Sequence, residues 1–386
     1  MVSIDRKIFE EDSAVRRRIL EYGSLFEELH VIIFCLRGRG FRKQKISGKV
    51  WLHPTNSRFR FLAIIDAVHI GMKLKKHFLH DVGEDNNERI IVSSQDPFET
   101  GLAGWILAKR LHAKLQLQIH TDFLSPYFAK GNIINWLRVY LAYFLLPRAD
   151  GIRVVSRRIK DSLHRVFRQT LPTSRVTVLP IFVEVRPIIE WKPVFQLRDK
   201  LPVARFHILM VSRLVPEKNI GLGLEILAEI MREYPLTGLV IIGEGTEKPV
   251  LIRRAQELGV DRNVAFLPWT TDVISAMKTA NLFLLTSFYE GYGMTLIEAG
   301  LSGVPIVTCD VGAARELFKD REHALICPVG DKNCFRESVI RLIEDNELRE
   351  NLRAKTRSHL EHLLSSKKKY LSNFKRSFER CFESLA

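Results

Sequence analysis

Residues Leu282–Thr308 decide the fold, and they read LFLLTSFYEGYGMTLIEAGLSGVPIVT. An apolar run, a short loop with glycines, a helical pattern and a second apolar run follow one another. This is the order of a βαβ unit, which joins parallel strands. Ligands of open parallel sheets bind at the carboxyl ends of the strands, so the loop around Glu290 is predicted to lie at a ligand site.

This loop and the helix after it carry groups suited to a phosphate-bearing ligand. Gly291 and Gly293 let the backbone approach a ligand closely, and the N–H groups of Gly293–Thr295 at the start of the helix favour an anion. Glu298 follows Glu290 by eight residues, so both carboxylates can face one ligand. The alternative for either glutamate alone is a solvated side chain.

Outward from this stretch, short β-type runs alternate with longer helical patterns, such as 219–233, 247–258 and 333–345. The alternation predicts an α/β protein with doubly wound, Rossmann-like parallel sheets. Nearly continuous Val, Ile and Leu is typical of strands covered on both faces. The predicted strands are 29–36, 89–93, 114–119, 151–155 and 175–179, and then 207–212, 238–242, 264–267, 282–286, 305–308 and 324–327.

Both periodicities are lost over Pro187–Pro202, where proline and charge indicate a connection between domains. We therefore expect a first domain over 1–190, a linker over 191–204 and a second domain over 205–365. The tail, 366–386, is basic and amphipathic. We expect it to form a last helix that packs back on the first domain.

The net charge of +15 is unevenly distributed. Residues 1–195 hold 32 Lys and Arg against 19 Asp and Glu, whereas residues 196–386 hold 27 against 25. A positive field attracts nucleic acid, anionic lipid or a polyanionic substrate. The first half is therefore predicted to meet an acidic partner.

The cysteines are scattered and form no C-x-x-C pair, which predicts reduced thiols in a cytosolic protein and argues against a zinc site. With no D-x-D motif either, we predict no metal and no cofactor. The N-terminal residues contain no apolar run of a secretory signal, so we expect a cytoplasmic protein. The five cysteines are Cys35, Cys309, Cys327, Cys334 and Cys381.

Two more loops of the second half follow predicted strands. Arg213 and Lys218 come after the strand 207–212, where two cations can neutralise a diphosphate; the alternative is an ordinary surface loop. Gly243 and Gly245 follow the strand 238–242 and permit close backbone approach. They lack the third glycine of a dinucleotide fingerprint, which argues against an oxidoreductase.

Over about residues 205–330 these patterns together resemble the retaining glycosyltransferases of family 4, the glycosyl transferases group 1, which have the two-domain GT-B fold. The resemblance implies transfer of a sugar from a nucleotide sugar, most simply a UDP- or GDP-sugar, to a lipid-linked or glycan acceptor. The patterns, in order, are S-R-L-x-x-E-K-N at 212–219, G-E-G at 243–245, V-A-F-L-P at 264–268, E-G-Y-G-x-x-x-x-E-A at 290–299, G-x-P at 303–305 and V-G-x-x-x-E at 311–316.

The resemblance also implies a role for individual residues. Glu290 and His120 would be the catalytic residues, and His120 lies in Q-I-H-T-D at the end of a predicted strand, where the alternative is a structural histidine. Glu298 would bind the ribose. The diphosphate would meet Arg213, Lys218, Gly293, Met294 and Thr295; the sugar would meet Glu290, Tyr292 and Gly293; the base would meet Leu267, Pro268 and Trp269.

The first half follows the family pattern less closely. Its first strand is predicted to be the few residues from Val2, and the place of the family's glycine-rich loop, Glu11–Val15, has no glycine. The apolar helical pattern Ile133–Leu146 is too short to span a bilayer and is followed by many basic residues. This favours peripheral binding to an anionic membrane, and the alternative is a core helix beside a solvated surface. The basic residues are Arg148, Arg153, Arg157, Arg158, Lys160 and Arg165, with a second run of Arg37, Arg39, Arg42, Lys43, Lys45 and Lys49.

Two other functions stay open from the sequence. A nucleotide-sugar epimerase of the same fold would use the same donor site. A basic nucleic-acid-binding protein would explain the charge, although no helix-turn-helix, zinc-finger or aromatic RNA-binding motif is present.

Overall fold

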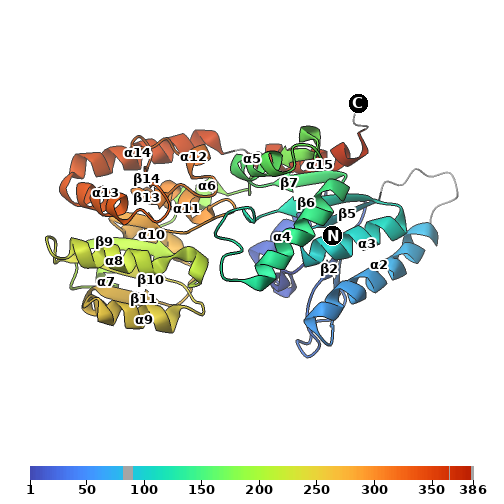
Figure 1. Ribbon diagram of the computed structural model, residues 1–386, viewed down its shortest axis with the longest axis horizontal. Helices are drawn as coiled ribbons and strands as arrows, with labels where there is room; N and C mark the ends of the chain where they lie inside the picture. Colours follow the sequence, from blue (N-terminus) through green and yellow to red (C-terminus); the bar gives the residue numbers. More distant parts are fainter. Residues whose placement is uncertain (81–89, 365, 384–386) are drawn as a thin grey trace. The chain divides into compact units, whose positions relative to one another are not determined.

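The computed structural model describes residues 1–80, 90–364 and 366–383, and it divides the chain into two units (Figure 1). Unit 1 comprises Met1–Pro180 and Lys368–Ala386, and unit 2 comprises Ile181–Lys367. Each unit is an α/β body around its own largely parallel sheet. The predicted fold class, two Rossmann-like domains, is confirmed.

Unit 1 is built on an eight-stranded sheet in the order β3-β4-β2-β1-β5-β6-β7-β8. All its neighbouring strands pair in parallel except β3 and β4, which form an antiparallel edge. The strands are β1 (Val2–Ser3), β2 (Leu29–Ile33), β3 (Gln44–Ser47), β4 (Val50–Pro54), β5 (Ile91–Ser94), β6 (Lys114–Ile119), β7 (Gly151–Val154) and β8 (Val176–Val178). The helices are α1 (Ala14–Gly23), α2 (Ala63–His80), α3 (Glu99–Leu111), α4 (Ile133–Leu145), α5 (Arg157–Val166) and, from the C-terminal end of the chain, α15 (Lys367–Glu379).

Unit 2 is built on a six-stranded, wholly parallel sheet in the order β11-β10-β9-β12-β13-β14. α8 packs against α9 and α13, whereas α11 packs against α10, α14 and α6. The strands are β9 (Phe206–Val211), β10 (Thr237–Ile242), β11 (Val264–Leu267), β12 (Leu282–Leu285), β13 (Ile306–Cys309) and β14 (Leu325–Cys327). The helices are α6 (Val185–Ile189), α7 (Leu197–Lys200), α8 (Ile220–Ile230), α9 (Lys248–Glu257), α10 (Val273–Thr279), α11 (Met294–Ser302), α12 (Ala314–Leu317), α13 (Lys332–Glu344) and α14 (Asn346–Leu363).

Every strand predicted from the apolar runs is present within a few residues, and the short first strand at Val2 is present as β1. Arg89, at the start of one predicted strand, lies outside the described residues. Sequence analysis missed the β3–β4 hairpin. β3 alternates between half-buried and exposed side chains, so its residues resemble a charged surface loop rather than a buried apolar strand.

The last helix, α15, packs against α1 of unit 1. The Tyr22 and Phe374 rings stack with centroids 3.9 Å apart, and the Tyr22 and Tyr370 hydroxyls lie 2.8 Å apart. Residues 191–204, expected to be a linker, fall within unit 2. There the indole N–H of Trp191 and the backbone N–H of Val194 both donate to Ser275 Oγ.

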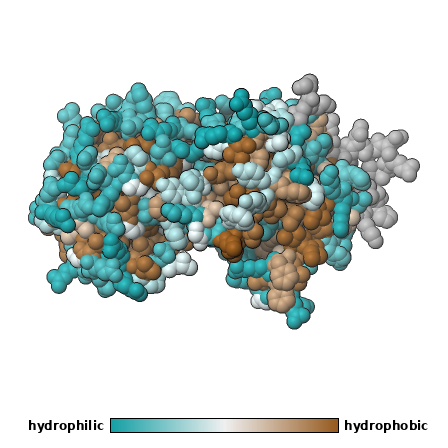
Figure 2. All heavy atoms as spheres, viewed as in Figure 1, coloured by the Kyte–Doolittle hydropathy of each residue, from teal (hydrophilic) through white to brown (hydrophobic). Residues whose placement is uncertain are grey.

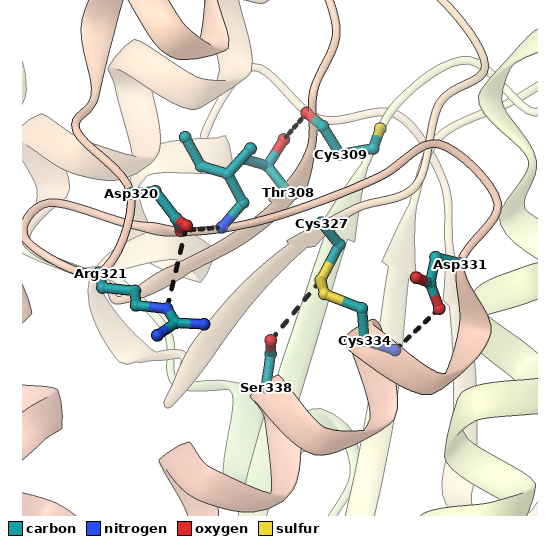
Figure 3. The surroundings of a disulfide bond; sticks show 9 residues. Thr308, Cys309, Asp320, Arg321, Cys327, Asp331, Cys334 and Ser338 are labelled. Atoms are coloured by element: carbon teal, nitrogen blue, oxygen red, sulfur yellow. Dashed lines mark hydrogen bonds and ion pairs between the residues drawn. A yellow bond between two sulfur atoms is a disulfide. The ribbon is translucent and has the colours of Figure 1, made fainter.

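The expectation that all cysteines are reduced thiols is wrong for one pair, because the structure joins Cys327 and Cys334 in a disulfide (Figure 3). Cys327 ends β14, and Cys334 lies in the first turn of α13, whose cap Asp331 accepts from the Cys334 N–H at 3.0 Å. The chain reverses between them and brings the two Cα atoms to 5.7 Å, a normal disulfide separation. Cys35, Cys309 and Cys381 are free and buried.

The sequence predicted that Arg153 would belong to a basic surface, and this prediction is wrong. It lies inside β7, is buried, and donates to Gln118 Oε1 at 3.0 Å and to the carbonyl oxygen of Leu179. A charge whose hydrogen bonds are made inside the sheet stabilises the core of unit 1 and does not contribute to its surface.

Among the described residues, no helix has both the length and the apolar character needed to cross a bilayer.

Candidate functional site

The loops after β9 and β12 meet at the edge of the unit 2 sheet. The chain builds the sheet outward from β9 to β11 in one direction and from β12 to β14 in the other, so the order reverses between these two paired strands. The Phe288 N–H donates to the Glu217 carbonyl at 2.9 Å, and Thr286 Oγ1 donates to the Asn219 carbonyl at 2.9 Å. This switch point is where open α/β sheets bind their ligands.

A buried ion pair joins the two loops. Lys218 Nζ lies 2.6 Å from Glu290 Oε1, and both side chains are largely buried, at 13% and 14% exposure. The Ser287 hydroxyl donates to the same oxygen at 2.8 Å. Glu290 is therefore held in one orientation, while the Lys218 ammonium keeps two further N–H donors for a ligand anion.

Arg213 lies in the same loop as Lys218 but has a different environment. Its side chain is 69% exposed and pairs with Glu217 at 3.1 Å, four residues on. A long exposed side chain in a weak surface pair can reorient toward a phosphate at little cost. The structure thus brings Lys218 and Glu290 into contact and leaves Arg213 on the surface beside them.

Gly243 and Gly245 allow a close approach, but the partner is the protein itself. A Cβ at Gly243 would lie 1.8 Å from the Ser212 carbonyl oxygen, and one at Gly245 would lie 2.1 Å from the Leu214 carbonyl oxygen. The Leu214 N–H donates to the Glu244 carbonyl at 2.8 Å. These glycines therefore hold the loop that carries Arg213 against the end of β10.

The start of α11 presents backbone N–H groups at the same edge. Gly293 has a φ of +92°, which glycine adopts readily, and it turns the chain from the Glu290 loop into the helix. The first N–H groups of a helix, here those of Met294 and Thr295, lack intrahelical acceptors and carry the positive end of the helix dipole. Tyr292 is buried beneath this turn, and its carbonyl accepts from the Ala313 N–H at 3.0 Å.

Glu298 lies in the second turn of α11 and is half-buried. Burial raises the pKa of its carboxyl to about 7. Near neutral pH this carboxyl is therefore balanced between a form that only accepts hydrogen bonds and one that also donates. Either form can bind a pair of hydroxyl groups.

The predicted base-binding segment follows β11 at the same edge of the sheet, two strands from β9. The Leu267 carbonyl accepts from the Gly243 N–H at 3.1 Å, which ties this segment to the end of β10. Pro268 and Trp269 are exposed, and Trp269 retains 53% of its surface. An exposed indole at this edge of the sheet is suited to stacking on a planar ring.

His120 belongs to unit 1, at the carboxyl end of β6, whereas every other predicted site residue belongs to unit 2. Its Nε2 lies 3.4 Å from Gln118 Oε1. Burial, with the positive charge of Arg153, lowers the pKa of His120 to about 3. The imidazole is therefore neutral at pH 7 and can exchange hydrogen bonds but brings no charge.

Three residues of the unit 2 site escaped sequence analysis. Ser287 holds Glu290, as described above, and the buried Cys309 thiol donates to the Ser287 carbonyl at 2.8 Å. Gly312 has a φ of +54°, and a Cβ there would lie 2.8 Å from the Glu290 Cβ. The only available signal was Gly312 in the V-G-x-x-x-E pattern, because the other two act through contacts between strands distant in sequence.

Two family models match the chain in succession. Glycosyltransferase Family 4 matches residues 17–186, and Glycosyl transferases group 1 matches residues 196–359. N-acetyl-alpha-D-glucosaminyl L-malate synthase of Bacillus anthracis is 21% identical over 89% of this chain and 88% of its own. Alpha-monoglucosyldiacylglycerol synthase of Streptococcus pneumoniae is 29% identical over 60% of this chain and 54% of its own.

Solved structures show the same fold over the whole length. Sucrose-phosphate synthase from Thermosynechococcus elongatus has a TM-score of 0.76 at 16% identity, covering 99% of this chain and 98% of its own. HepE of Anabaena, solved in complex with UDP, has a TM-score of 0.72 at 15% identity and covers 98% of both chains. With both units matched in order, the chain belongs to the family 4 glycosyltransferases and has their GT-B fold.

Proposed function

We propose that this enzyme transfers a hexose-type sugar from a nucleoside-diphosphate sugar, with UDP or GDP as the carrier, and retains the anomeric configuration. The observation that carries the proposal is the Lys218–Glu290 pair, which lies at the switch point of the unit 2 sheet. It combines a cation for a phosphate with a fixed carboxylate for sugar hydroxyls. HepE, which shares the fold, was solved with UDP.

In this proposal the diphosphate meets three sources of positive potential: Lys218, the adjustable Arg213 and the N–H groups of Gly293–Thr295. Glu298 binds the ribose hydroxyls, and the segment Leu267–Trp269 lies against the base. Residues whose charge is already in place stabilise the charge that develops on a leaving nucleoside diphosphate without reorganising. In this proposal Lys218 and the N–H groups of Gly293–Thr295 offer this without a bound metal, and Arg213 joins them by reorienting.

The reaction breaks the bond between the anomeric carbon and the donor phosphate oxygen, and the nucleoside diphosphate leaves with the electron pair. The acceptor hydroxyl attacks from the same face, and its proton passes to the departing phosphate oxygen. Glu290 and the backbone at Tyr292 and Gly293 orient the sugar. His120, neutral at pH 7, serves as a hydrogen-bond partner for a sugar hydroxyl rather than as a charged acid.

The proposed acceptor is a lipid-linked or saccharide hydroxyl, and the proposed location is the cytoplasm with peripheral contact to a membrane. The support comes from relatives. Alpha-monoglucosyldiacylglycerol synthase is named for a glycolipid product, and another relative, 28% identical over 61% of this chain, is named as an undecaprenol-linked glycan transferase.

The test begins with thermal unfolding in the presence of UDP-, GDP- and ADP-sugars. A ligand that binds the folded state stabilises it by RT ln(1 + [L]/Kd), so the correct donor raises the unfolding temperature most. We expect a UDP- or GDP-sugar to do so, and Lys218→Ala to abolish the shift. If none of the three classes shifts the wild-type transition, the donor proposal is wrong.

The second step separates transfer from epimerisation. With the bound donor, release of nucleoside diphosphate is followed with and without saccharides and detergent-dispersed glycolipids. A transferase releases it far faster with an acceptor, and NMR of the product gives the anomeric configuration. Conversion of the donor sugar in the absence of any acceptor would instead identify an epimerase.

A further inference from the structure

The outer face of α4 is the feature of unit 1 that sugar transfer leaves unexplained. In the described part of the chain, twenty large hydrophobic side chains are exposed, and seven of them lie on this one helix. Apolar side chains gathered in this way mark an interaction site. The seven are Ile133, Ile134, Trp136, Leu137, Tyr140, Tyr143 and Phe144, here called the α4 patch. Figure 2 shows hydrophobic side chains gathered on the face of unit 1 where α4 lies in Figure 1.

The usual amphipathic helix exposes polar side chains to solvent, whereas α4 exposes apolar side chains and turns its polar ones to the protein. Most of the α4 patch recurs at spacings of three and four residues and so forms one stripe, which contains no charged residue. The polar side chains of α4 point to neighbouring elements instead. Arg138 Nε donates to Glu99 Oε1 at 2.9 Å, and Asn135 Nδ2 donates to the Phe128 carbonyl at 2.9 Å.

Aromatic side chains lie within the stripe, and basic side chains lie near its ends. Trp136 and Tyr140, with ring centroids 4.3 Å apart, are of the types that favour the boundary between water and lipid. The exposed Arg148 follows α4 and stacks its guanidinium 3.8 Å from the Phe144 ring centroid. The exposed Lys130 precedes the helix. The stripe thus has a cation near each end.

Two more basic side chains lie near α4, at the end of α5. The Tyr143 and Phe167 rings lie 4.8 Å apart, which places the end of α5 beside α4. On either side of Phe167 in the sequence are the exposed Arg165 and Arg168. These cations belong to the basic first half of the chain, where residues 1–195 hold 32 basic against 19 acidic residues.

We infer that the α4 patch inserts into the surface of a bilayer that contains anionic lipid, with Lys130, Arg148, Arg165 and Arg168 at the level of the lipid phosphates. A helix of 13 residues is about 20 Å long, so it lies in the interface rather than crossing a hydrocarbon core of about 30 Å. Charge decides between lipid and a second copy of this chain, because two copies meeting at this face would bring like charges together. The inference deepens the proposed membrane contact by naming its surface and its lipid, and it uses the residues of unit 1 alone, so it can be tested without sugar transfer.

The test is co-sedimentation with vesicles of phosphatidylcholine, with and without phosphatidylglycerol, in the absence of donor and acceptor. The variant is Ile133→Ser/Leu137→Ser, whose two side chains are exposed and contribute little to folding. The matched control is Val250→Ser/Ile252→Ser on α9 of unit 2, which removes two exposed aliphatic side chains elsewhere. We expect wild type to bind the anionic vesicles in a salt-sensitive manner, the α4 variant to bind at least about tenfold more weakly, and the control to bind like wild type.

A second measurement follows Trp136 itself. Brominated phospholipid quenches an indole that enters the bilayer, and Trp136→Phe should remove the quenched component from the fluorescence. Failure of wild type to bind anionic vesicles, or equal binding by wild type and the α4 variant, would overturn the inference. Self-association in light scattering that the same substitutions abolish, without vesicle binding, would show that a second copy covers the face instead.

Discussion

The carboxyl edge of the unit 2 sheet and the outer face of α4 in unit 1 are built in opposite ways. At the sheet edge the charged side chains of Lys218 and Glu290 are largely buried and in contact with each other. On α4, apolar side chains point outward, and the charge of Arg138 is turned to the protein. The difference separates two kinds of recognition. A fixed buried charge pair suits one small polar ligand, whereas an exposed apolar stripe with basic margins suits an extended surface.

The largest effect is expected at the charge pair. Lys218→Ala should lower turnover about 10²–10³-fold, as for the loss of one strong transition-state stabiliser. It should also lower the free energy of unfolding by about 3 kcal/mol, because Glu290 is left buried and unpaired. Steady-state kinetics and urea unfolding measure the two effects.

Two further variants separate the causes of these losses. Lys218→Met/Glu290→Gln should recover stability but not turnover. Arg213→Ala should lower turnover to a similar extent at a stability cost below about 1 kcal/mol, because its ion pair is exposed. Wild-type turnover in either single alanine variant would refute the assigned role.

The next comparison makes the same substitution, Leu to Ala, once on the buried face and once on the exposed face of α4. Leu145 is fully buried and Leu137 is 56% exposed. Leu145→Ala should cost about 3 kcal/mol of unfolding free energy, from lost burial and a cavity. Leu137→Ala should change it by less than about 0.5 kcal/mol. Equal costs would mean that the outer face is covered within the folded chain.

The pH dependence of Glu298 offers a smaller effect. Its pKa is about 7 in the folded chain against 4.5 ordinarily, so between these values the folded chain holds a proton that the unfolded chain has released. Stability therefore falls as pH rises through this window. Glu298→Gln cannot ionise, so relative to wild type it should gain about 2–3 kcal/mol between the lower and the upper end of the window. A constant difference between the two proteins would show that the carboxyl is not shifted.

The smallest effect is expected at the Cys327–Cys334 disulfide, which closes a loop of only a few residues. Chain entropy predicts that Cys334→Ser costs about 2 kcal/mol when wild type is oxidised, and nothing when wild type is reduced. Unfolding of both proteins with and without dithiothreitol measures this. If dithiothreitol leaves the wild-type transition unchanged and alkylation finds five free thiols, the pair is not bonded in solution.

The amino-acid sequence predicted which loops of unit 2 meet at one edge of its sheet, because these loops follow strands. Once the alternation of strands and helices is recognised, parallel pairing places the loops of Lys218 and Glu290 at one edge, although 72 residues separate them. The β3–β4 hairpin was missed because β3 alternates between half-buried and exposed side chains and so resembles a surface loop. The disulfide was missed because cysteine spacing does not reveal a chain reversal.

By itself, then, the sequence determined the α/β class, the strands of both sheets apart from the β3–β4 hairpin, and the loops at one edge of the unit 2 sheet. Local periodicity and turn residues carry that information. Only the tertiary structure decided which side chains touch. It turned Glu290 onto Lys218 and Ser287, buried Arg153 within β7, and aimed the apolar face of α4 outward. These outcomes depend on how elements distant in sequence pack together, which no local pattern encodes.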